Sequence, residues 1–174
     1  MRQDPGDRIR PARKAVIFNM IVRKYRSEDL SEILKLFYDT VHSVCKADYT
    51  LAQLDAWAPA APDTERWRAS LEKHYALVAL ADGTIAGFGD IDETGYLDRL
   101  YVHKDRIRRG AGGALLTKLE NAYPVTEITT HASITAKPFF EAKGYVAIRE
   151  QQVERRGVTM TNFVMKKSLE PLIY

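Results

Sequence analysis

One stretch of the chain constrains its fold more than any other. The apolar segment 100–104 leads into the basic, glycine-rich segment 106–113, which opens onto an apolar pattern of helical spacing over 115–122. Glycines let a ligand approach the backbone closely, and the free N–H groups at a helix start attract anions. The order of strand, glycine loop and helix therefore predicts a phosphate-binding site. Three arginines add positive charge to it: Arg106, Arg108 and Arg109.

Two other phosphate-binding loops do not match this stretch. A P-loop ends in Gly-Lys-Ser or Gly-Lys-Thr, and neither tripeptide follows here. A dinucleotide-binding turn needs a third glycine three residues after the second, and that position holds Leu115. Nucleoside triphosphates and dinucleotides are therefore not the predicted ligands.

The stretch resembles the acetyl-CoA loop of the GNAT (GCN5-related N-acetyltransferase) superfamily. That loop reads [Gln/Arg]-x-x-Gly-x-[Gly/Ala] after a strand ending Leu-x-Val, and 100–102 with 110–112 match it, whereas Ile107 replaces the first Gln or Arg. The resemblance implies that main-chain N–H groups hold the CoA diphosphate and that a splayed strand receives the pantetheine arm. The implied cofactor-binding residues are Leu100, Tyr101, Val102, Arg108, Arg109, Gly110, Ala111, Gly112, Gly113, Ala114 and Phe140.

Segment 136–145 resembles a second GNAT signature, Ala-x-x-Phe-Tyr-x-x-x-Gly-[Phe/Tyr]. In the family, the tyrosine of this pair often protonates the leaving thiolate, but here Phe140 stands in its place and has no proton to give. Ser133, Tyr145 or a water molecule are the remaining candidates for the acid, because a thiol of pKa about 8.5 leaves with modest help. For Phe139 and Phe140, packing against sheet and cofactor is the simpler interpretation.

An amine must be neutral before it can attack a thioester, so acetyl transfer needs a base or a water path to one. The nearest carboxylates are Asp98 and Glu93, and we expect Asp98 to share a strand face with Leu100, two residues along. The alternative for Asp98 is an ion pair with the adjacent Arg99. His103 and His131 are interpreted as surface residues.

The acceptor side is less constrained. In GNAT proteins the segment between the first strand and the following hairpin shapes this side. Here its polar and aromatic candidates, for which pocket lining and core packing both stay open, are Tyr49, Gln53, Trp57 and Trp67. Segments 48–57 and 156–165 further resemble the YafP-like branch of the superfamily.

The predicted elements alternate in type. Strands are expected at 21–25, 77–80, 84–89, 96–103, 127–132, 145–148 and 159–165, and helices at 27–44, after Thr50, at 64–75, from about 112 to 121 and from about 135 to 144. This order predicts an α+β fold with a mixed, mostly antiparallel sheet flanked by helices. Residues 20–174 are expected to form one such domain behind a mobile extension, residues 1–19.

The composition limits the functions and the cellular compartment that the chain suits. The chain has 174 residues with 45% hydrophobic residues, a net charge of only +3 and one cysteine, Cys45. These values argue against a broad nucleic-acid surface and an internal disulfide, and no apolar run has transmembrane or signal-peptide character. A cytoplasmic protein without metal is expected, a monomer or homodimer.

The predicted function is direct transfer of acetyl from acetyl-CoA to an amine in a ternary complex. Transfer through Cys45 is one alternative. A non-catalytic acyl-CoA sensor of the same fold is another, and a binder of some other phosphorylated metabolite is a third.

Overall fold

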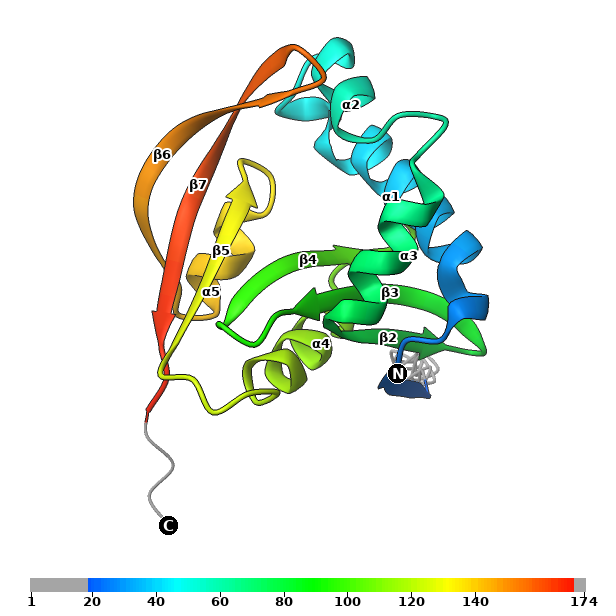
Figure 1. Cartoon of the computed structure of the whole chain (residues 1–174), viewed down its shortest axis with the longest axis vertical. Helices are drawn as coiled ribbons and strands as arrows, with labels where there is room; N and C mark the ends of the chain where they lie inside the picture. The colour runs from blue at the N-terminus through cyan, green and yellow to red at the C-terminus, as the bar shows by residue number, and fades with distance from the viewer. Residues whose placement is uncertain (1–18, 171–174) are drawn as a thin grey trace, which may run out of the picture.

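The computed structural model describes residues 19–170 (Figure 1). Its strands are β1 (Met20–Lys24), β2 (Tyr75–Ala81), β3 (Thr84–Ile91), β4 (Tyr96–Val102), β5 (Glu127–Ser133), β6 (Val146–Arg155) and β7 (Val158–Ser168). Its helices are α1 (Leu30–Val44), α2 (Leu51–Trp57), α3 (Thr64–Lys73), α4 (Ala111–Glu120) and α5 (Lys137–Ala142), with 3-10 turns at Ser27–Asp29 and Cys45–Ala47. Except for Asn19, the predicted extension 1–19 lies outside the described residues.

The strands form one seven-stranded sheet in the order β1-β2-β3-β4-β5-β7-β6. Every neighbouring pair is antiparallel except β4 and β5, which run parallel and pair only through Tyr96 with Thr129 and Leu97 with Thr130. Beyond Leu97 the two strands diverge, and the β5-β7-β6 part turns away from the rest of the sheet (Figure 1). The sheet is therefore open at its middle, on the side where β4 ends.

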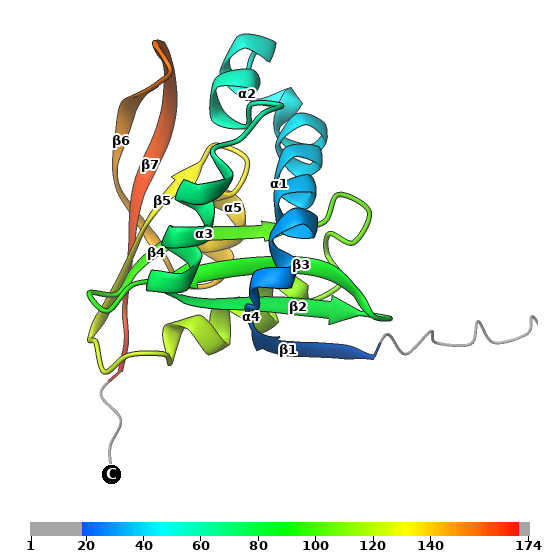
Figure 2. The same ribbon diagram turned by 45° about the vertical axis from the view of Figure 1, so that its right-hand side comes forward.

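Helices cover both faces of the sheet (Figure 2). The stripe Leu30, Ile33, Phe37 and Val41 of α1 is at most 7% exposed and packs, together with α2 and α3, on one face. Burying a Leu, Ile or Phe side chain contributes roughly 1.5–3 kcal/mol each. On the opposite face, α4 and α5 pack against β2 to β5 through a second core. None of the helices within residues 19–170 has the length and apolar run needed to cross a bilayer.

Several local predictions are confirmed. The α+β fold with a mostly antiparallel sheet is present, and Thr50 caps α2 in a reciprocal capping box with Gln53. The Asp82-Gly83 turn joins β2 to β3 with φ values of +52° and +80°, the left-handed pair that a tight hairpin requires. Proline lies in the first turn of α5 as expected.

Two local predictions are wrong. Ser27 does not cap a long helix, because Asp29 accepts the Arg26 N–H at 2.8 Å and residues 27–29 form a separate 3-10 turn before α1. The strand predicted at 145–148 extends to Arg155, because β6 and β7 pair along nearly their whole length. The polar stretch 149–155 lacks an apolar alternation, so pairing with β7 determines its conformation.

Candidate functional site

Helix α4 begins without a capping side chain. Its N-cap residue, Gly110, has a φ of +93°, a value that strains any residue with a Cβ. Within residues 19–170, no side chain accepts a hydrogen bond from the N–H groups of Ala111, Gly112 or Gly113. These amides and the positive end of the helix dipole are therefore available to an external anion.

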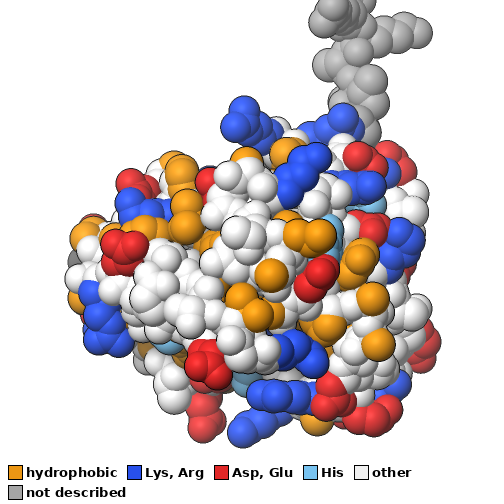
Figure 3. Space-filling view, turned by 90° about the horizontal axis from the view of Figure 1, so that it is seen from above, with side chains coloured by type: hydrophobic (Ala, Val, Ile, Leu, Met, Phe, Trp, Pro, Cys, Tyr) orange, Lys and Arg blue, Asp and Glu red, His pale blue; other side chains and the backbone are white. Residues whose placement is uncertain are grey.

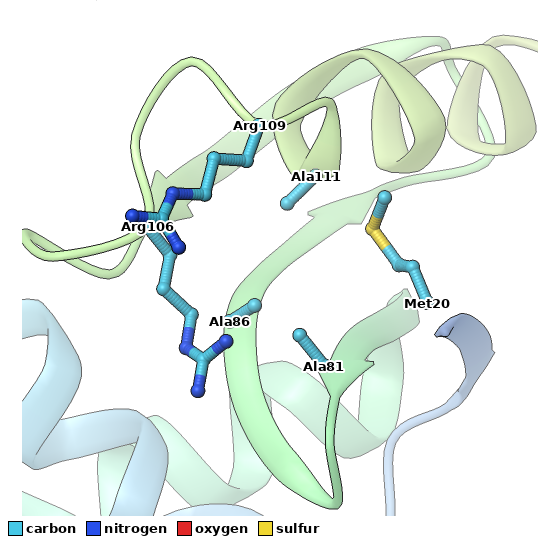
Figure 4. A pocket seen from close by; sticks show the side chains of 6 residues that line it. All are labelled: Met20, Ala81, Ala86, Arg106, Arg109 and Ala111. Atoms are coloured by element: carbon cyan, nitrogen blue, oxygen red, sulfur yellow. The ribbon is translucent and has the colours of Figure 1, made fainter. Parts of the chain in front are cut away.

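Two arginines of the loop lie beside this helix start. Arg106 turns back to the β2–β3 hairpin, where it lies 3.3 Å from Thr84 Oγ1 and 3.8 Å from Asp82 Oδ2. Arg109 and Arg106 line a small hollow together with Met20, Ala81, Ala86 and Ala111 (Figure 4). Arg108 is exposed and has a φ of +60°. Arg106 and Arg109 therefore lie close to Ala111, in the first turn of α4.

The divergence of β4 from β5 leaves one edge of β4 without a strand partner after Leu97. On its other edge, Leu100, Tyr101 and Val102 pair with β3. The Val102 carbonyl accepts a hydrogen bond of 2.9 Å from Thr40 Oγ1 of α1. This carbonyl, which the family resemblance assigned to the pantetheine arm, therefore already has a partner within the protein. The remaining edge opens toward the start of α4.

The two phenylalanines of α5 have different surroundings. Phe140 is 4% exposed and packs edge-on against Tyr145, at 5.1 Å between ring centroids. The half-buried Phe139 lies against the first turn of α4, where a Cβ on Gly112 would come within 3.3 Å of its ring. Phe140 is thus a packing residue, whereas Phe139 lies beside the open start of α4.

The structure separates the two candidate acids. Ser133 ends β5, and its Oγ accepts the Ala136 N–H at 3.0 Å, which leaves the hydroxyl proton without an assigned acceptor among residues 19–170. The Tyr145 hydroxyl donates to Glu120 Oε1 at 2.9 Å, at the far end of α4 from Gly110. Burial, followed by the charge of Glu120, raises the pKa of Tyr145. The geometry therefore brings Ser133, and not Tyr145, to the open end of β5.

Asp98 occupies a β-bulge. In the pairing of β3 with β4, Asp90 lies opposite Arg99 and Ile91 opposite Leu97, so Asp98 is an extra residue. The expectation that Asp98 shares a face with Leu100 is wrong, because the bulge breaks the alternation. Leu100 packs toward α4, whereas the Asp98 carboxylate lies on the other face, 3.9 Å from His74 Nδ1.

Asp98 is the least engaged member of a charged cluster. The Arg99 guanidinium donates to Asp90 at 2.8 Å and to Ser70 at 2.9 Å, and it stays 3.7 Å from Asp98. His74 Nδ1 lies 2.7 Å from Asp90, and this hydrogen bond raises the pKa of His74. Burial raises the pKa of Asp90, which the contacts to His74 and Arg99 oppose.

This cluster decides between the two interpretations of Asp98. Arg99 satisfies mainly Asp90, so the predicted ion pair with Asp98 is only a secondary contact. The Asp98 side chain is 32% exposed, and that of Asp90 is fully buried. His74, Asp90 and Asp98 bring one possible metal ligand atom each within 4.8 Å, but Arg99 already supplies a cation to Asp90. Glu93 is exposed in the turn between β3 and β4.

Aromatic side chains surround Tyr101 on the face of α1. Its ring stacks on Phe88 at 5.6 Å between centroids, meets Phe37 edge-on at 4.9 Å and lies 6.3 Å from Trp57. Trp67 packs on Phe37 and carries the Arg99 guanidinium over its ring. Trp57 and Trp67 thus pack in this core, and together with Tyr101 they form an aromatic wall on this face of β4.

Tyr49 and Gln53 connect this wall to the outer strands. The Tyr49 hydroxyl accepts the Ile134 N–H at 2.9 Å and donates to the Thr161 carbonyl at 2.7 Å. Gln53 Nε2 donates to the Thr159 carbonyl at 3.0 Å. Both side chains therefore hold the segment before α2, and α2 itself, against β7.

Comparison with known proteins identifies this arrangement. Residues 45–168 match the sequence model of the acetyltransferase (GNAT) domain. The chain therefore belongs to the GNAT family of acetyltransferases. Within the family it falls in the YafP-like branch: it is 36% identical over 148 residues to the uncharacterized N-acetyltransferase YafP of Escherichia coli (strain K12), covering 85% of this chain and 95% of YafP.

Solved structures share the fold. A GCN5-related N-acetyltransferase from Rhodopseudomonas palustris superposes with a TM-score of 0.82 at 34% identity, covering 86% of this chain and 95% of that one. The PaiA N-acetyltransferase of Thermoplasma acidophilum, solved with coenzyme A, gives a TM-score of 0.70 at 17% identity over 86% and 99% of the two chains. YncA of Salmonella typhimurium, solved with acetyl-CoA, gives 0.66 at 16% over 90% and 97%. The last two share the fold alone.

Proposed function

We propose that this protein transfers an acetyl group from acetyl-CoA directly to an amine within a ternary complex. The observation that carries the proposal is the uncapped start of α4 at Gly110, beside the edge of β4 that β5 leaves unpaired. In this proposal the amides of residues 110–113 hold the diphosphate, with Arg108 and Arg109 adding charge, whereas the Ala114 N–H already donates to the Gly110 carbonyl at 3.0 Å. The pantetheine arm then runs along Leu100, Tyr101 and Val102 into the opening of the sheet.

The amine attacks the thioester carbonyl with its lone pair, and the carbon–sulfur bond breaks as the tetrahedral intermediate collapses. Asp98 is the proposed base that takes the proton lost by the amine, because it is the partly exposed carboxylate of the cluster. Main-chain N–H groups at the open edge of β4 stabilise the oxyanion. His74 and Arg99 position Asp98 on the face of the aromatic wall.

The departing thiolate takes a proton from Ser133 or from water. Ser133 is favoured over Tyr145 because its hydroxyl proton is unassigned, whereas the Tyr145 hydroxyl already donates to Glu120. Phe140 supplies no proton and contributes packing behind the cofactor. A thiol needs only modest assistance to leave, so this step tolerates the missing tyrosine.

A covalent route through Cys45 is disfavoured. Its side chain is 5% exposed in the core under α1, and burial raises the pKa of its thiol. A reactive cysteine needs an accessible thiolate, which this environment opposes.

A second candidate function is a sensor that binds acyl-CoA without chemistry. Two observations favour it: Phe140 stands at the position of the family's acid, and the Tyr145 hydroxyl is engaged with Glu120. A sensor would bind acyl-CoA at the same site as the enzyme but would transfer no acyl group to an acceptor.

Release of free thiol from acetyl-CoA, measured with a panel of amines, separates the two. The acetyltransferase releases CoA in proportion to an added amine and forms the N-acetyl product, which mass spectrometry identifies. Saturable CoA binding with no product from any amine favours the sensor.

The proposal extends to a cytoplasmic setting, which suits the single cysteine.

A further inference from the structure

The inner face of the β6–β7 hairpin looks onto the proposed acceptor side. Gln151, Val153 and Arg155 alternate on this face of β6. Val153 packs against the core under α1, and Gln151 Nε2 lies 3.5 Å from His131 Nδ1 on β5. Arg155 therefore projects from the same face, near the end of the hairpin.

The charge of Arg155 reaches side chains from several elements. Burial raises the pKa of Tyr49, before α2, and of Tyr96 and Tyr101 on β4, and the charge of Arg155 opposes this rise. At His131 on β5, burial lowers the pKa, and Arg149 and Arg155 lower it further. Within residues 19–170, no carboxylate lies within ion-pair distance of Arg155. Among the described residues, the exposed Arg155 guanidinium is thus left without an ion-pair partner, on the hairpin face that looks toward α2 and β5.

Asp98 acts on the same groups with the opposite sign. Burial, followed by the charge of Asp98, raises the pKa of Tyr96. At His131, burial and two arginines lower the pKa, and the charge of Asp98 opposes them. The rings of Tyr96 and His131 meet edge-on at 5.3 Å, and both lie on the face that carries Asp98. Asp98 follows Tyr96 by two residues on β4, and Arg155 shares the hairpin face of Gln151, which lies 3.5 Å from His131, so the two charges lie on either side of this pair of rings.

A buried hydrogen-bond acceptor lies in the same region. Asn162 on β7 is 8% exposed, and no donor within residues 19–170 hydrogen-bonds to its Oδ1 atom. It lies between Ser133 on β5 and Gln151 on β6, and two residues after Met160, which packs in the core under α1. A buried carbonyl oxygen without a donor destabilises the folded protein, and a ligand N–H would relieve that cost.

The aromatic wall adds an apolar boundary. Trp57 and Tyr101 lie on this side of β4, at 6.3 Å between ring centroids. From the end of the molecule where α2 and the β6–β7 turn lie, hydrophobic side chains gather in the middle of the surface, and charged ones lie mostly around them (Figure 3). The region therefore combines two opposite charges with an apolar surface.

On the basis of the proposed function, we propose that the acetyl acceptor is an amine that also carries a carboxylate, with an apolar side chain, as in an aromatic amino acid. The amine lies at Asp98 and loses its proton there as it attacks the thioester. The carboxylate pairs with Arg155 and takes no part in the bond changes. Asn162 Oδ1 accepts an N–H of the acceptor.

The test compares phenylalanine with 2-phenylethylamine, which lacks only the carboxylate. Thiol release from acetyl-CoA is measured for the wild-type protein, for Arg155→Gln and for Arg156→Gln. Arg156 is the matched control, because it carries the same charge on the adjacent residue, in the turn. Comparing the ratio of the two kcat/KM values across variants cancels the different basicity of the two amines.

Arg155→Gln is expected to lower kcat/KM for phenylalanine by about 10- to 100-fold, the usual range for a lost charged hydrogen bond. The value for 2-phenylethylamine stays within about twofold, and Arg156→Gln changes neither. Equal losses for both amines in Arg155→Gln, or the same ratio change in Arg156→Gln, would overturn the assignment.

Absence of turnover with every amine contradicts the proposed acetyl transfer but leaves carboxylate recognition measurable. Phenylalanine is then titrated calorimetrically into the CoA-saturated protein. Binding that weakens about 10-fold or more in Arg155→Gln supports the carboxylate site. Binding that is absent, or unaffected by the substitution, overturns it.

Discussion

Gly112 and Phe139 meet where α4 and α5 approach each other: a Cβ on Gly112 would lie 3.3 Å from the Phe139 ring and 3.4 Å from Val102 Cγ2. The first turn of α4 thus has room for a backbone and a ligand, but little for a side chain. This contact links the segment around Phe139, which resembles the second GNAT signature, to the loop that begins at Arg106.

Gly112→Glu is expected to weaken CoA binding by about 100-fold or more, equivalent to about 3 kcal/mol, because it places bulk and negative charge where the diphosphate lies. Isothermal titration with CoA measures the loss. Thr117→Glu adds the same charge on the exposed part of α4 and should bind CoA normally. Gly112→Ala, which adds bulk without charge, separates the two effects. Unchanged affinity in a folded Gly112→Glu protein contradicts this placement of the cofactor.

Asp98→Asn should reduce kcat about 10²- to 10⁴-fold, the usual contribution of a general base. CoA affinity should not change, since Asp98 lies away from α4. The residual rate should rise with pH as more of the free amine is neutral. Glu93→Gln removes the other carboxylate that the sequence offered and should leave kcat within about twofold. A fully active Asp98→Asn protein would show that another residue is the base, and His74 would be the next residue to test.

Tyr145→Phe should leave kcat within about twofold, because the hydroxyl donates to Glu120 and not toward the thioester. It should lower the free energy of unfolding by about 1 kcal/mol. The cost is modest since Lys167 keeps two contacts to Glu120, at 2.9 and 3.0 Å. Steady-state kinetics and urea unfolding measure the two effects. A tenfold fall in kcat with normal stability would instead assign Tyr145 as the acid.

Asp29 is expected to make stability depend on acid pH. Arg23 donates two hydrogen bonds of 2.8 Å to its carboxylate and, as the largest influence, lowers the pKa of Asp29 below 3.8. A lowered pKa in the folded state stabilises the protein at pH values above 3.8, and this contribution is lost as the pH falls through the folded pKa.

Asp29→Asn should therefore lower the free energy of unfolding by about 1–3 kcal/mol at neutral pH. The gap to the wild-type protein should narrow as the pH falls below 3.8, as urea unfolding at several pH values will show. Glu28→Gln, at the exposed neighbouring carboxylate, serves as the control. A gap that stays constant with pH would mean that the Arg23 pair contributes nothing through ionisation.

Local signals predicted most of the fold because they act within a few residues. The capping box at Thr50, the Asp82-Gly83 turn and the glycine loop before α4 each carry their geometry in the sequence. The order of strands and helices then indicated the mixed sheet, and the resemblance to GNAT proteins indicated the cofactor side.

The acceptor side could not be predicted as fully, because it depends on pairing between distant segments. The bulge that turns Asp98 away from Leu100 arises from the register of β3 with β4. His74 joins the cluster only because β3 brings Asp90 beside it, although a carboxylate in the apolar run 85–91 was a signal for a buried partner. The inward positions of Arg155 and Asn162 follow from the long β6–β7 pairing.

A crystal structure of the protein with CoA bound tests the central proposal most directly. The diphosphate should accept hydrogen bonds from the amides at the start of α4, from Gly110 to Gly113, and the thiol should lie in the opening between β4 and β5 on the side of Asp98. A diphosphate bound elsewhere, or α4 amides that turn to protein side chains while CoA is bound, would contradict both the cofactor site and the acetyl transfer built on it.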